Sequence, residues 1–370
     1  MMQITKITLY LVEQTLKTPF ISSLERVEER ESILIKIKDA EGFEGWGEVV
    51  AFSSPWYTEE TVKTCWHIIE DFLAPILYRN TIEHPSDTID LFKGIKRNQM
   101  AKSGVETALW DLYSKRNGMS LARAIGGTRT RIASGVVVGI SEVNEMINTI
   151  DKYVNEGYKR IKIKIKPGND YHIVKSIRDR FPDLPLMVDA NSSYSLEQID
   201  SLKALDSFGL MMIEQPLESD DIVDHAKVQK HLHTPICLDE SIVTYEDARK
   251  AIELGSCKII NIKVGRVGGL TEAIRIQNLC KENNIPVWCG GMLEMGVSRA
   301  VNIALASLDH FSIPGDVSAS ARYWEEDITV PEVKVVDGYI DVPEKPGIGF
   351  DLNMKRLKAV TKYKKEILSN

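Results

Sequence analysis

Hydrophobic and polar positions alternate in two different styles along the chain. Up to about residue 125, the segments ITKITLYLV and SILIKIKDAEGFEGWGEV alternate with a period of two, which predicts a small antiparallel meander with a glycine-containing turn. Residues 58–77 and 102–115 instead carry apolar side chains at helical spacing, which predicts two helices. This part of the sequence therefore predicts a small α+β domain.

From about Ile132 onward, short apolar or β-branched runs alternate with amphipathic helical segments. The runs are ASGVVVGI, RIKIKIK, LPLMVDAN, LMMIEQP, PICLDES, KIINIKV, IPVWCG and FSIPGD. Such alternation is typical of the α/β class, and eight regular units favour a closed (β/α) barrel over the alternative, an open doubly wound sheet. After Asp316 the sequence becomes irregular and β-like again, and we expect this tail to pack on the N-terminal domain.

These patterns predict two domains. We expect residues 1–125 to form an α+β capping domain that the tail, about residues 325–370, joins. Residues 126–324 are expected to form the barrel. A length of 370 residues agrees with this division, because a barrel commonly uses about 250 residues as one domain.

Composition narrows the class of protein without naming its chemistry. The chain is 43% hydrophobic and 27% charged, as ordinary globular proteins are. Its net charge of −7, without basic blocks, disfavours nucleic-acid binding. We expect neither a signal peptide nor a membrane span, because no apolar run is long enough. The five cysteines are scattered and form no CxxC pair, which argues against zinc fingers or disulfides and favours the cytoplasm.

One charged residue closes each of five successive strand-like runs. Consecutive members of this series are 24 or 25 residues apart, which is about the length of one βα unit; they are Lys164, Asp189, Glu214, Asp239 and Lys263. The spacing predicts that all five lie at the same height, near the carboxyl ends of the strands. Barrel enzymes place their active sites at that face.

The run RIKIKIK predicts which way the lysines point. Ile161, Ile163 and Ile165 share one face of the strand, and Lys162 and Lys164 share the other. The isoleucines should pack on the outer helices, so the lysines should point into the barrel mouth. A half-exposed strand with its lysines in water is the alternative, which the regular spacing of the carboxylates disfavours.

Three carboxylates that converge in one cavity require a cation between them. Asp189, Glu214 and Asp239 offer only oxygen ligands, which favours a hard ion such as Mg²⁺, with Mn²⁺ as the alternative. Acids that merely lie at surface strand ends are the competing interpretation.

The two series lysines would then face the metal from opposite sides. A lysine that acts as a base near neutral pH needs a pKa well below about 10.4. Partial burial, the metal and the like charge of Lys162 could each lower the pKa of Lys164. Lys164 and Lys263 would suit proton abstraction next to a metal-bound carboxylate, with stabilisation of the resulting enediolate.

With the KxK pair, the three acids and Lys263 in place, the whole chain resembles the enolase superfamily, in its muconate-lactonizing-like subgroup. The segments GYKRIKIKIKPG, MVDANSSY, MMIEQPL, CLDES, KIINIKVGRVGGL and WCGGMLE look like the o-succinylbenzoate synthase branch, which also contains N-acylamino acid racemases. The segment AFSSPWYTEE resembles the Bacillus-type members of that branch. The resemblance implies a modified (β/α)7β TIM barrel with an α+β capping domain.

The resemblance also implies a reaction. A Mg²⁺-dependent hydro-lyase of this branch converts 2-succinyl-6-hydroxy-2,4-cyclohexadiene-1-carboxylate to o-succinylbenzoate in menaquinone biosynthesis, by syn loss of water. Lys164 would take the α proton and return a proton to the leaving hydroxyl, and Lys263 would remain an ammonium. N-succinylamino acid racemase is the alternative, in which the two lysines alternate as acid and base. A non-catalytic barrel that only binds a ligand is the alternative of another class.

Further site residues follow from the same resemblance. Glu240 and Ser241 would orient Asp239. Backbone N–H groups of residues 290–293 could bind a substrate carboxylate, although a tight turn explains that segment equally well. Residues 20–23 and 51–54 are expected to close over the substrate, with plain surface loops as the alternative. The residues expected to bind substrate are Ser53, Ser134, Gly135, Asn191, Gly291, Met292 and Leu293.

Three remaining expectations concern partners and weaker signals. The expected partners are a small-molecule substrate and further copies of the chain, with no nucleic acid and no membrane. His231 and His233 form an HxH pair, but it precedes its strand and should lie on the wrong face of the barrel for a metal site. The role of Arg266, in GRVGGL, stays open.

Overall fold

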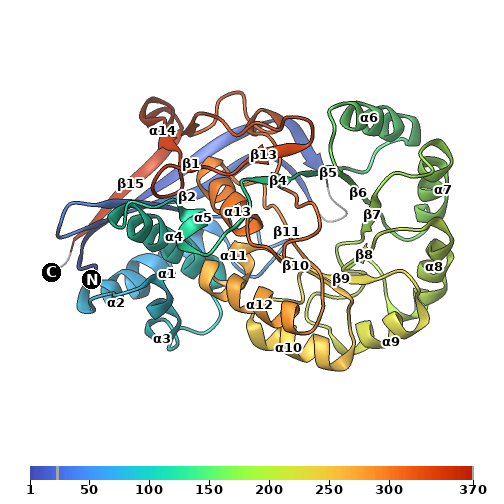
Figure 1. Ribbon diagram of the computed structural model, residues 1–370, viewed down its shortest axis with the longest axis horizontal. Helices are drawn as coiled ribbons and strands as arrows, with labels where there is room; N and C mark the ends of the chain where they lie inside the picture. The colour runs from blue at the N-terminus through green and yellow to red at the C-terminus, as the bar shows by residue number, and fades with distance from the viewer. Residues whose placement is uncertain (22–24, 369–370) are drawn as a thin grey trace.

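The computed structural model describes residues 1–21 and 25–368. A four-stranded antiparallel sheet lies at one end of the molecule, in the order β15-β1-β2-β3 (Figure 1). Its strands are β1 (Ile4–Ile21), β2 (Arg26–Asp39), β3 (Glu44–Val49) and β15 (Thr361–Leu368). The first and last strands of the described residues are therefore neighbours, and the end of the tail pairs with the N-terminal strand. Strands β1 and β2 extend well beyond the predicted meander.

The predicted helices of this region are present, with shifted ends. The first begins four residues later than predicted, where Thr61 caps α1 (Val62–Ile68), and it continues through a π-helical turn (Ile69–Leu73) into α2 (Ala74–Arg79). The second lies within α4 (Gln99–Arg116), and two short helices, α3 (Thr88–Leu91) and α5 (Leu121–Ala124), accompany it. Helix α4 packs directly on β3.

Seven parallel strands form a curled sheet in strict sequence order, from β5 to β11. They are β5 (Gly135–Val138), β6 (Arg160–Lys164), β7 (Leu186–Asp189), β8 (Ile213–Glu214), β9 (Ile236–Leu238), β10 (Ile259–Ile262) and β11 (Val287–Cys289). The sequential order excludes the doubly wound alternative, because such a sheet reverses its order at a switch point. The predicted α/β class with a modified (β/α)7β barrel and an α+β cap is confirmed.

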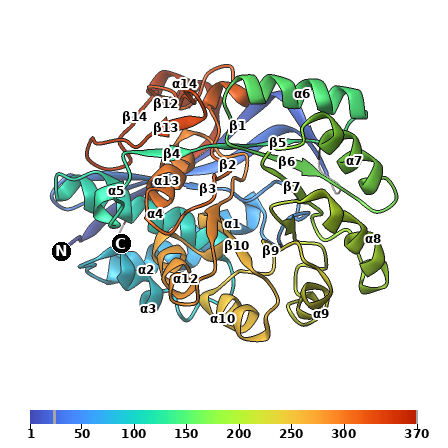
Figure 2. The same ribbon diagram turned by 45° about the vertical axis from the view of Figure 1, so that its right-hand side comes forward.

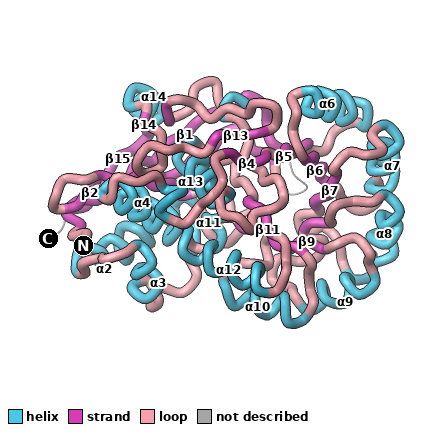
Figure 3. Tube along the Cα trace, viewed as in Figure 1, coloured by secondary structure: helices cyan, strands magenta, loops and turns pink. Residues whose placement is uncertain are grey.

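Helices cover the outer face of this sheet (Figures 2 and 3). They are α6 (Val143–Asn155), α7 (Asp170–Arg180), α8 (Ile199–Ala204), α9 (Val223–His231), α10 (Tyr245–Leu254), α11 (Val264–Val267), α12 (Leu270–Glu282) and α13 (Gly296–Ala306). Within the described residues, no helix is both long and apolar enough to cross a membrane.

The eighth strand-like run, FSIPGD, forms no regular strand. Gly315 makes only an isolated parallel bridge with Ser134, and the Asp316 amide donates to the Cys289 carbonyl at 2.8 Å. These contacts connect the segment to both edges of the seven-stranded sheet. The run therefore brings the two edges of the barrel together with very few hydrogen bonds.

The tail after the barrel contains short elements before it reaches β15. Strand β13 (Tyr339–Asp341) pairs with β4 (Arg131–Ala133), and β12 (Thr329–Val330) pairs with β14 (Asp351–Leu352), which helix α14 (Met354–Val360) follows. The domain limits at residues 125 and 324 stay a prediction.

The barrel interior has an apolar floor beneath the charged strand ends. A separate cluster of buried side chains fills the lower part; its members are Met187, Met212, Cys237, Ile259 and Trp288. On β6, Ile161 and Ile163 are fully buried in the main core. The charged residues lie above this apolar cluster, at the carboxyl end of the sheet, where the site lies.

We predict that Gly47→Ala destabilises the protein by about 1–3 kcal/mol or more, because the added methyl group would overlap the carbonyl oxygen of Gly104 in α4. Gly94→Ala is the matched control, because a Cβ at this exposed position meets nothing within 4 Å. Its free energy of unfolding should stay within about 0.5 kcal/mol of wild type. Urea denaturation measures both, and equal stabilities would contradict the close packing of β3 on α4.

Candidate active site

The charged series meets at the carboxyl ends of five neighbouring strands. Lys164 pairs with Asp189 in the register of β6 and β7, and Asp189 pairs with Glu214 in the register of β7 and β8. Asp239 directly follows β9, and Lys263 directly follows β10. Each of these five residues is at most 6% exposed, so none of the five side chains lies in water.

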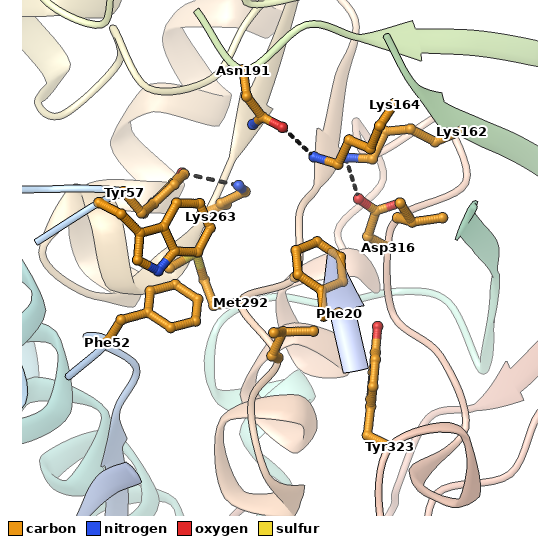
Figure 4. Close-up of a pocket in the computed structure, with 14 residues that line it drawn as sticks. Phe20, Phe52, Tyr57, Lys162, Lys164, Asn191, Lys263, Met292, Asp316 and Tyr323 are labelled. Carbon is orange, nitrogen blue, oxygen red and sulfur yellow. Dashed lines mark hydrogen bonds and ion pairs between the residues drawn. The ribbon is translucent and has the colours of Figure 1, made fainter. Parts of the chain in front are cut away.

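A cavity opens above these residues, and side chains from both the cap and the barrel enclose it (Figure 4). Lys162 and Lys164 lie on one wall, and Lys263 lies on the opposite wall. The full lining consists of Phe20, Phe52, Trp56, Tyr57, Val137, Lys162, Lys164, Asn191, Lys263, Gly291, Met292, Leu293, Asp316 and Tyr323. The cavity therefore joins two charged walls with an aromatic and apolar rim.

On the first wall, each lysine is held by several oxygen atoms. The Lys164 ammonium donates to Asp189 Oδ2 at 2.7 Å and to Asn191 Oδ1 at 2.5 Å. The Lys162 ammonium contacts Asp316 Oδ2 at 2.6 Å, Glu214 Oε2 at 3.0 Å and Asp189 Oδ2 at 3.2 Å. Lys162 thus lies among three carboxylates, below Lys164 on the same strand.

On the opposite wall, Tyr57 from the cap completes a second network. The Lys263 ammonium donates to Asp239 Oδ2 at 2.7 Å and to the Tyr57 hydroxyl at 2.9 Å. Arg266 forms an ion pair with Asp239 and also donates to Tyr57 at 3.1 Å and to the Ile242 carbonyl at 2.8 Å. Arg266 therefore belongs to the site, which answers the question left open by the sequence.

Neighbouring oxygen groups favour the charged forms of Lys162 and Lys263. Burial works to lower the pKa of Lys162, but the attraction of Asp316 and the neighbouring acids outweighs burial and raises that pKa above its ordinary value. Burial likewise opposes a charge on Lys263, and Tyr57 together with Glu240 outweighs it, so this pKa is also raised. The raised pKa values favour the charged forms of Lys162 and Lys263 at neutral pH.

The acids respond to the same charges in opposite directions. Burial alone would raise the pKa of Asp189, but the attraction of Lys164 and Lys162 outweighs burial and lowers it. Burial raises the pKa of Glu214, and repulsion by Asp189 raises it further. Burial and the repulsion from Asp189 together therefore favour the protonated form of Glu214 more than in water.

The three predicted metal ligands fit a hard divalent cation by their chemistry. They are buried oxygen donors on three adjacent strands, and two of them repel each other. Among the described residues, however, no three His, Cys, Asp or Glu side chains are arranged to hold a metal ion. The Lys162 ammonium contacts both Asp189 and Glu214, and the Lys263 ammonium contacts Asp239. A bound cation therefore has to displace ammonium groups from these carboxylates.

Several of the other predicted residues line or support the cavity. Asn191, Gly291, Met292 and Leu293 line it. Glu240 Oε1 accepts from the Asn191 amide at 2.9 Å, so it orients Asn191.

Ser241 is linked to Asp239 through a third residue. Both backbone amides donate to Gln215 Oε1, at 3.3 Å from Ser241 and 3.0 Å from Asp239. Gln215 lies in the left-handed region, with φ of 37°. This shared amide oxygen fixes the loop that carries Asp239.

Three predicted substrate contacts do not reach the cavity. Ser53 hydrogen-bonds to Glu31 at 2.5 Å on the surface of the cap. Ser134 is buried and donates to the Val317 carbonyl. At Gly135, a Cβ would collide with the guanidinium of Arg160, so this glycine provides space for a buried arginine.

The cap contributes aromatic side chains from the two segments that were expected to close over the substrate. Phe20 lies 5.9 Å from Lys164 Nζ, measured to the ring centroid, and residues 22 and 23 of the same segment are outside the described residues. Phe52 packs on Trp56 with 4.7 Å between ring centroids. Both phenylalanines line the cavity.

Sequence reasoning missed Trp56, Tyr57, Asp316, Val137 and Tyr323, which also line the cavity. Asp316 had a usable signal, because it closes the eighth strand-like run as the other charged residues close theirs. Tyr57 had none, since a cap residue reaches the barrel only through tertiary packing. The HxH pair lies around the end of α9, ahead of β9, and neither histidine is among the residues that line the cavity.

Comparisons with known proteins agree with this geometry. A family model described as "Mandelate racemase / muconate lactonizing enzyme, N-terminal domain" matches residues 5–126, and one described as "Enolase C-terminal domain-like" matches residues 145–356. The chain is 56% identical to an o-succinylbenzoate synthase of Bacillus subtilis over 363 residues, which are 98% of each protein.

Two further relatives extend the comparison. An N-succinylamino acid racemase of Thermus thermophilus is 42% identical over 365 residues, 98% of this chain and 99% of the relative. The crystal structure of an enolase superfamily member from Listeria innocua superposes with a TM-score of 0.98 at 44% identity and covers 100% of both chains. From its sequence, fold and strand-end residues, the chain belongs to the mandelate racemase/muconate lactonizing enzyme family of the enolase superfamily.

Proposed function

We propose that the protein is an o-succinylbenzoate synthase, a hydro-lyase that removes water from 2-succinyl-6-hydroxy-2,4-cyclohexadiene-1-carboxylate. The observation that carries the proposal is the pair of lysines that face one cavity from opposite walls, beside three buried acids. The 56% identity to a synthase over nearly the whole chain supports it. The proposal includes a role in menaquinone biosynthesis, a cytoplasmic location and a homo-oligomeric state, as the family resemblance implies.

Lys164 moves the proton in this proposal. Asp189 and Asn191 hold its Nζ at the cavity wall, at 2.7 Å and 2.5 Å. The neutral amine takes the proton on the carbon next to the substrate carboxylate, and the electron pair of that C–H bond passes into an enediolate. The same Nζ then gives a proton to the neighbouring hydroxyl, which leaves as water while the ring becomes aromatic. One group serves both steps, because a syn elimination involves one face of the ring.

Lys263 supplies positive charge on the other face. Its raised pKa, which Tyr57 and Glu240 support against the opposing effect of burial, keeps it an ammonium. A fixed ammonium stabilises the negative charge that develops on the substrate. Dehydration requires no proton transfer from this side, so a charged Lys263 suits it.

Asp189, Glu214 and Asp239 would hold the divalent cation, Mg²⁺ or alternatively Mn²⁺. When bound, the cation supplies Lewis-acid stabilisation of the negative charge on the substrate carboxylate. Apolar and aromatic residues that line the cavity exclude water. They are Phe20, Phe52 and Trp56 on the cap side, and Met292 and Leu293 on the barrel side. Such an apolar rim suits a six-membered carbon ring.

Racemisation of N-succinylamino acids is the second candidate activity. Two lysines on opposite walls suit a reaction that removes a proton on one face and returns it on the other. The 42% identity to the Thermus thermophilus racemase supports this candidate. It additionally requires Lys263 to lose its proton, which the attraction of Tyr57 and Glu240 disfavours.

We predict that Lys164→Ala lowers kcat for o-succinylbenzoate formation by about 10²–10⁴-fold, because the group that transfers the proton is lost. Lys166→Ala is the matched control: Lys166 follows on the same segment but is exposed, and its removal should leave kcat unchanged. Absorbance of the aromatic product measures both rates. Dehydration by Lys164→Ala at the wild-type rate would overturn the assignment of the base.

We predict that kcat/KM for dehydration exceeds that for racemisation of an N-succinylamino acid by at least about tenfold, or about 1.4 kcal/mol of transition-state stabilisation. Racemisation is followed in D₂O by NMR, as deuterium enters the α position. Lys263→Ala should abolish racemisation, because that reaction needs both lysines. A faster racemisation than dehydration would reverse the ranking of the two activities.

We predict that removal of divalent metal with EDTA abolishes dehydration and that Mg²⁺ restores it. Mg²⁺ at about 100 times its dissociation constant should also stabilise the folded protein by about 2.7 kcal/mol, because it binds three buried carboxylates of the native state. Calorimetric titration and thermal unfolding measure these effects. Absence of Mg²⁺ binding would favour the non-catalytic barrel instead.

A further inference from the structure

Lys162 and the proposed metal compete for the same carboxylates. The Lys162 ammonium contacts Glu214 at 3.0 Å and Asp189 at 3.2 Å, and both acids belong to the proposed metal set. Its shortest contact is with Asp316, at 2.6 Å, which is outside that set. Lys162 therefore has one anionic partner that a metal would leave in place.

Hydrogen bonds from its side chain and its backbone fix the position of Asp316. Its Oδ1 accepts from Arg160 Nη2 at 2.6 Å, and its amide donates to the Cys289 carbonyl at 2.8 Å. The guanidinium of Arg160 lies over the ring of Trp288, 4.8 Å from the centroid, and donates to the Pro314 carbonyl at 2.9 Å. The Asp316 carboxylate is thereby fixed between two cations, with one oxygen toward each.

Electrostatics gives this arrangement a consequence. If Asp189 and Glu214 turn to a divalent cation, Lys162 keeps its charge in a buried site close to that cation. An ammonium without an anionic partner is costly there, because burial removes its hydration and the cation repels it. Asp316 removes this cost, since it continues to neutralise Lys162 while the other two acids bind the metal.

We propose that Asp316 is a positioning residue that retains the Lys162 ammonium and so releases Glu214 and Asp189 to the divalent cation. The inference rests on the proposed function, because it requires a metal at these acids. It explains why the chain places a fourth carboxylate beside the three proposed ligands, fixed on a buried arginine. Asp316 acts through Lys162 and need not touch the metal itself.

The test is a double-mutant cycle read by metal affinity, without substrate. Metal-free full-length protein is titrated with Mg²⁺ and Mn²⁺ by calorimetry for wild type, Asp316→Asn, Lys162→Met and the double variant. Asp316→Asn should bind metal about 10–100-fold more weakly, because Lys162 then holds on to Glu214 and Asp189. Lys162→Met and the double variant should bind within about threefold of wild type, because Lys162 then no longer competes for Glu214 and Asp189.

Asp327→Asn is the matched control. Asp327 is a buried aspartate whose carboxylate accepts from the Gly296 amide at 2.9 Å and lies near Arg299, away from the cavity lining. The metal affinity of the Asp327→Asn variant should equal that of wild type even if the stability of the variant falls. Asp316→Glu, which keeps the charge, should recover most of the affinity that Asp316→Asn loses.

The outcomes distinguish failure of the proposed function from failure of the proposed role of Asp316. If wild type binds no divalent metal, the proposed function fails. If wild type binds metal and Asp316→Asn binds it equally well, only the role of Asp316 is overturned. An equal loss with and without Lys162 would show that Asp316 attracts the metal directly and would also overturn it. If Asp316→Asn does not fold, Lys162→Met alone tests the proposal. A more than tenfold gain in metal affinity on Lys162→Met would contradict it, because Lys162 would then compete for the two acids despite Asp316.

Discussion

The structure depends on the pairing of charges that the barrel buries at its mouth. An ionised side chain that leaves water needs a partner at hydrogen-bond distance, since the interior offers no other compensation. Here the strand-end lysines and acids provide each other with partners across strands, on top of an apolar floor. For the same reason, any further charged group in this site would have to replace a partner that an existing group gives up.

The cap and the barrel share this dependence through a second buried acid network. Glu48, at the end of β3, accepts backbone hydrogen bonds from Met295 and Ser298 at 2.8 Å each, at the start of α13. Burial raises the pKa of Glu48 to about 7 although these two hydrogen bonds oppose the shift. The loop that carries Gly291 and Met292 is therefore attached to the cap sheet, so the rim of the cavity and its wall form one structural unit.

Features that repeat with each βα unit could be predicted from the sequence, whereas contacts that occur only once could not. Regular spacing of Lys164, Asp189 and Glu214 reflects the βα repeat, so position along the chain translated directly into position around the barrel. Contacts made once were not accessible in this way. Tyr57 arrives from the cap, and Gly135 is required by a guanidinium 25 residues away, a relation that only the packed structure reveals. Ser53 is the converse case: it lies beside a cavity residue in sequence, but its side chain points to Glu31 on the surface.

The pairing of β15 with β1 has a consequence for how the protein folds. Lys6 lies opposite Leu368, so one edge of β1 is paired by residues that are very distant in sequence. Contacts that join such distant residues form late, because they close a very long loop of chain. The cap sheet is therefore completed by a long-range pairing, and the domain that contributes Phe20 and Phe52 to the cavity depends on it.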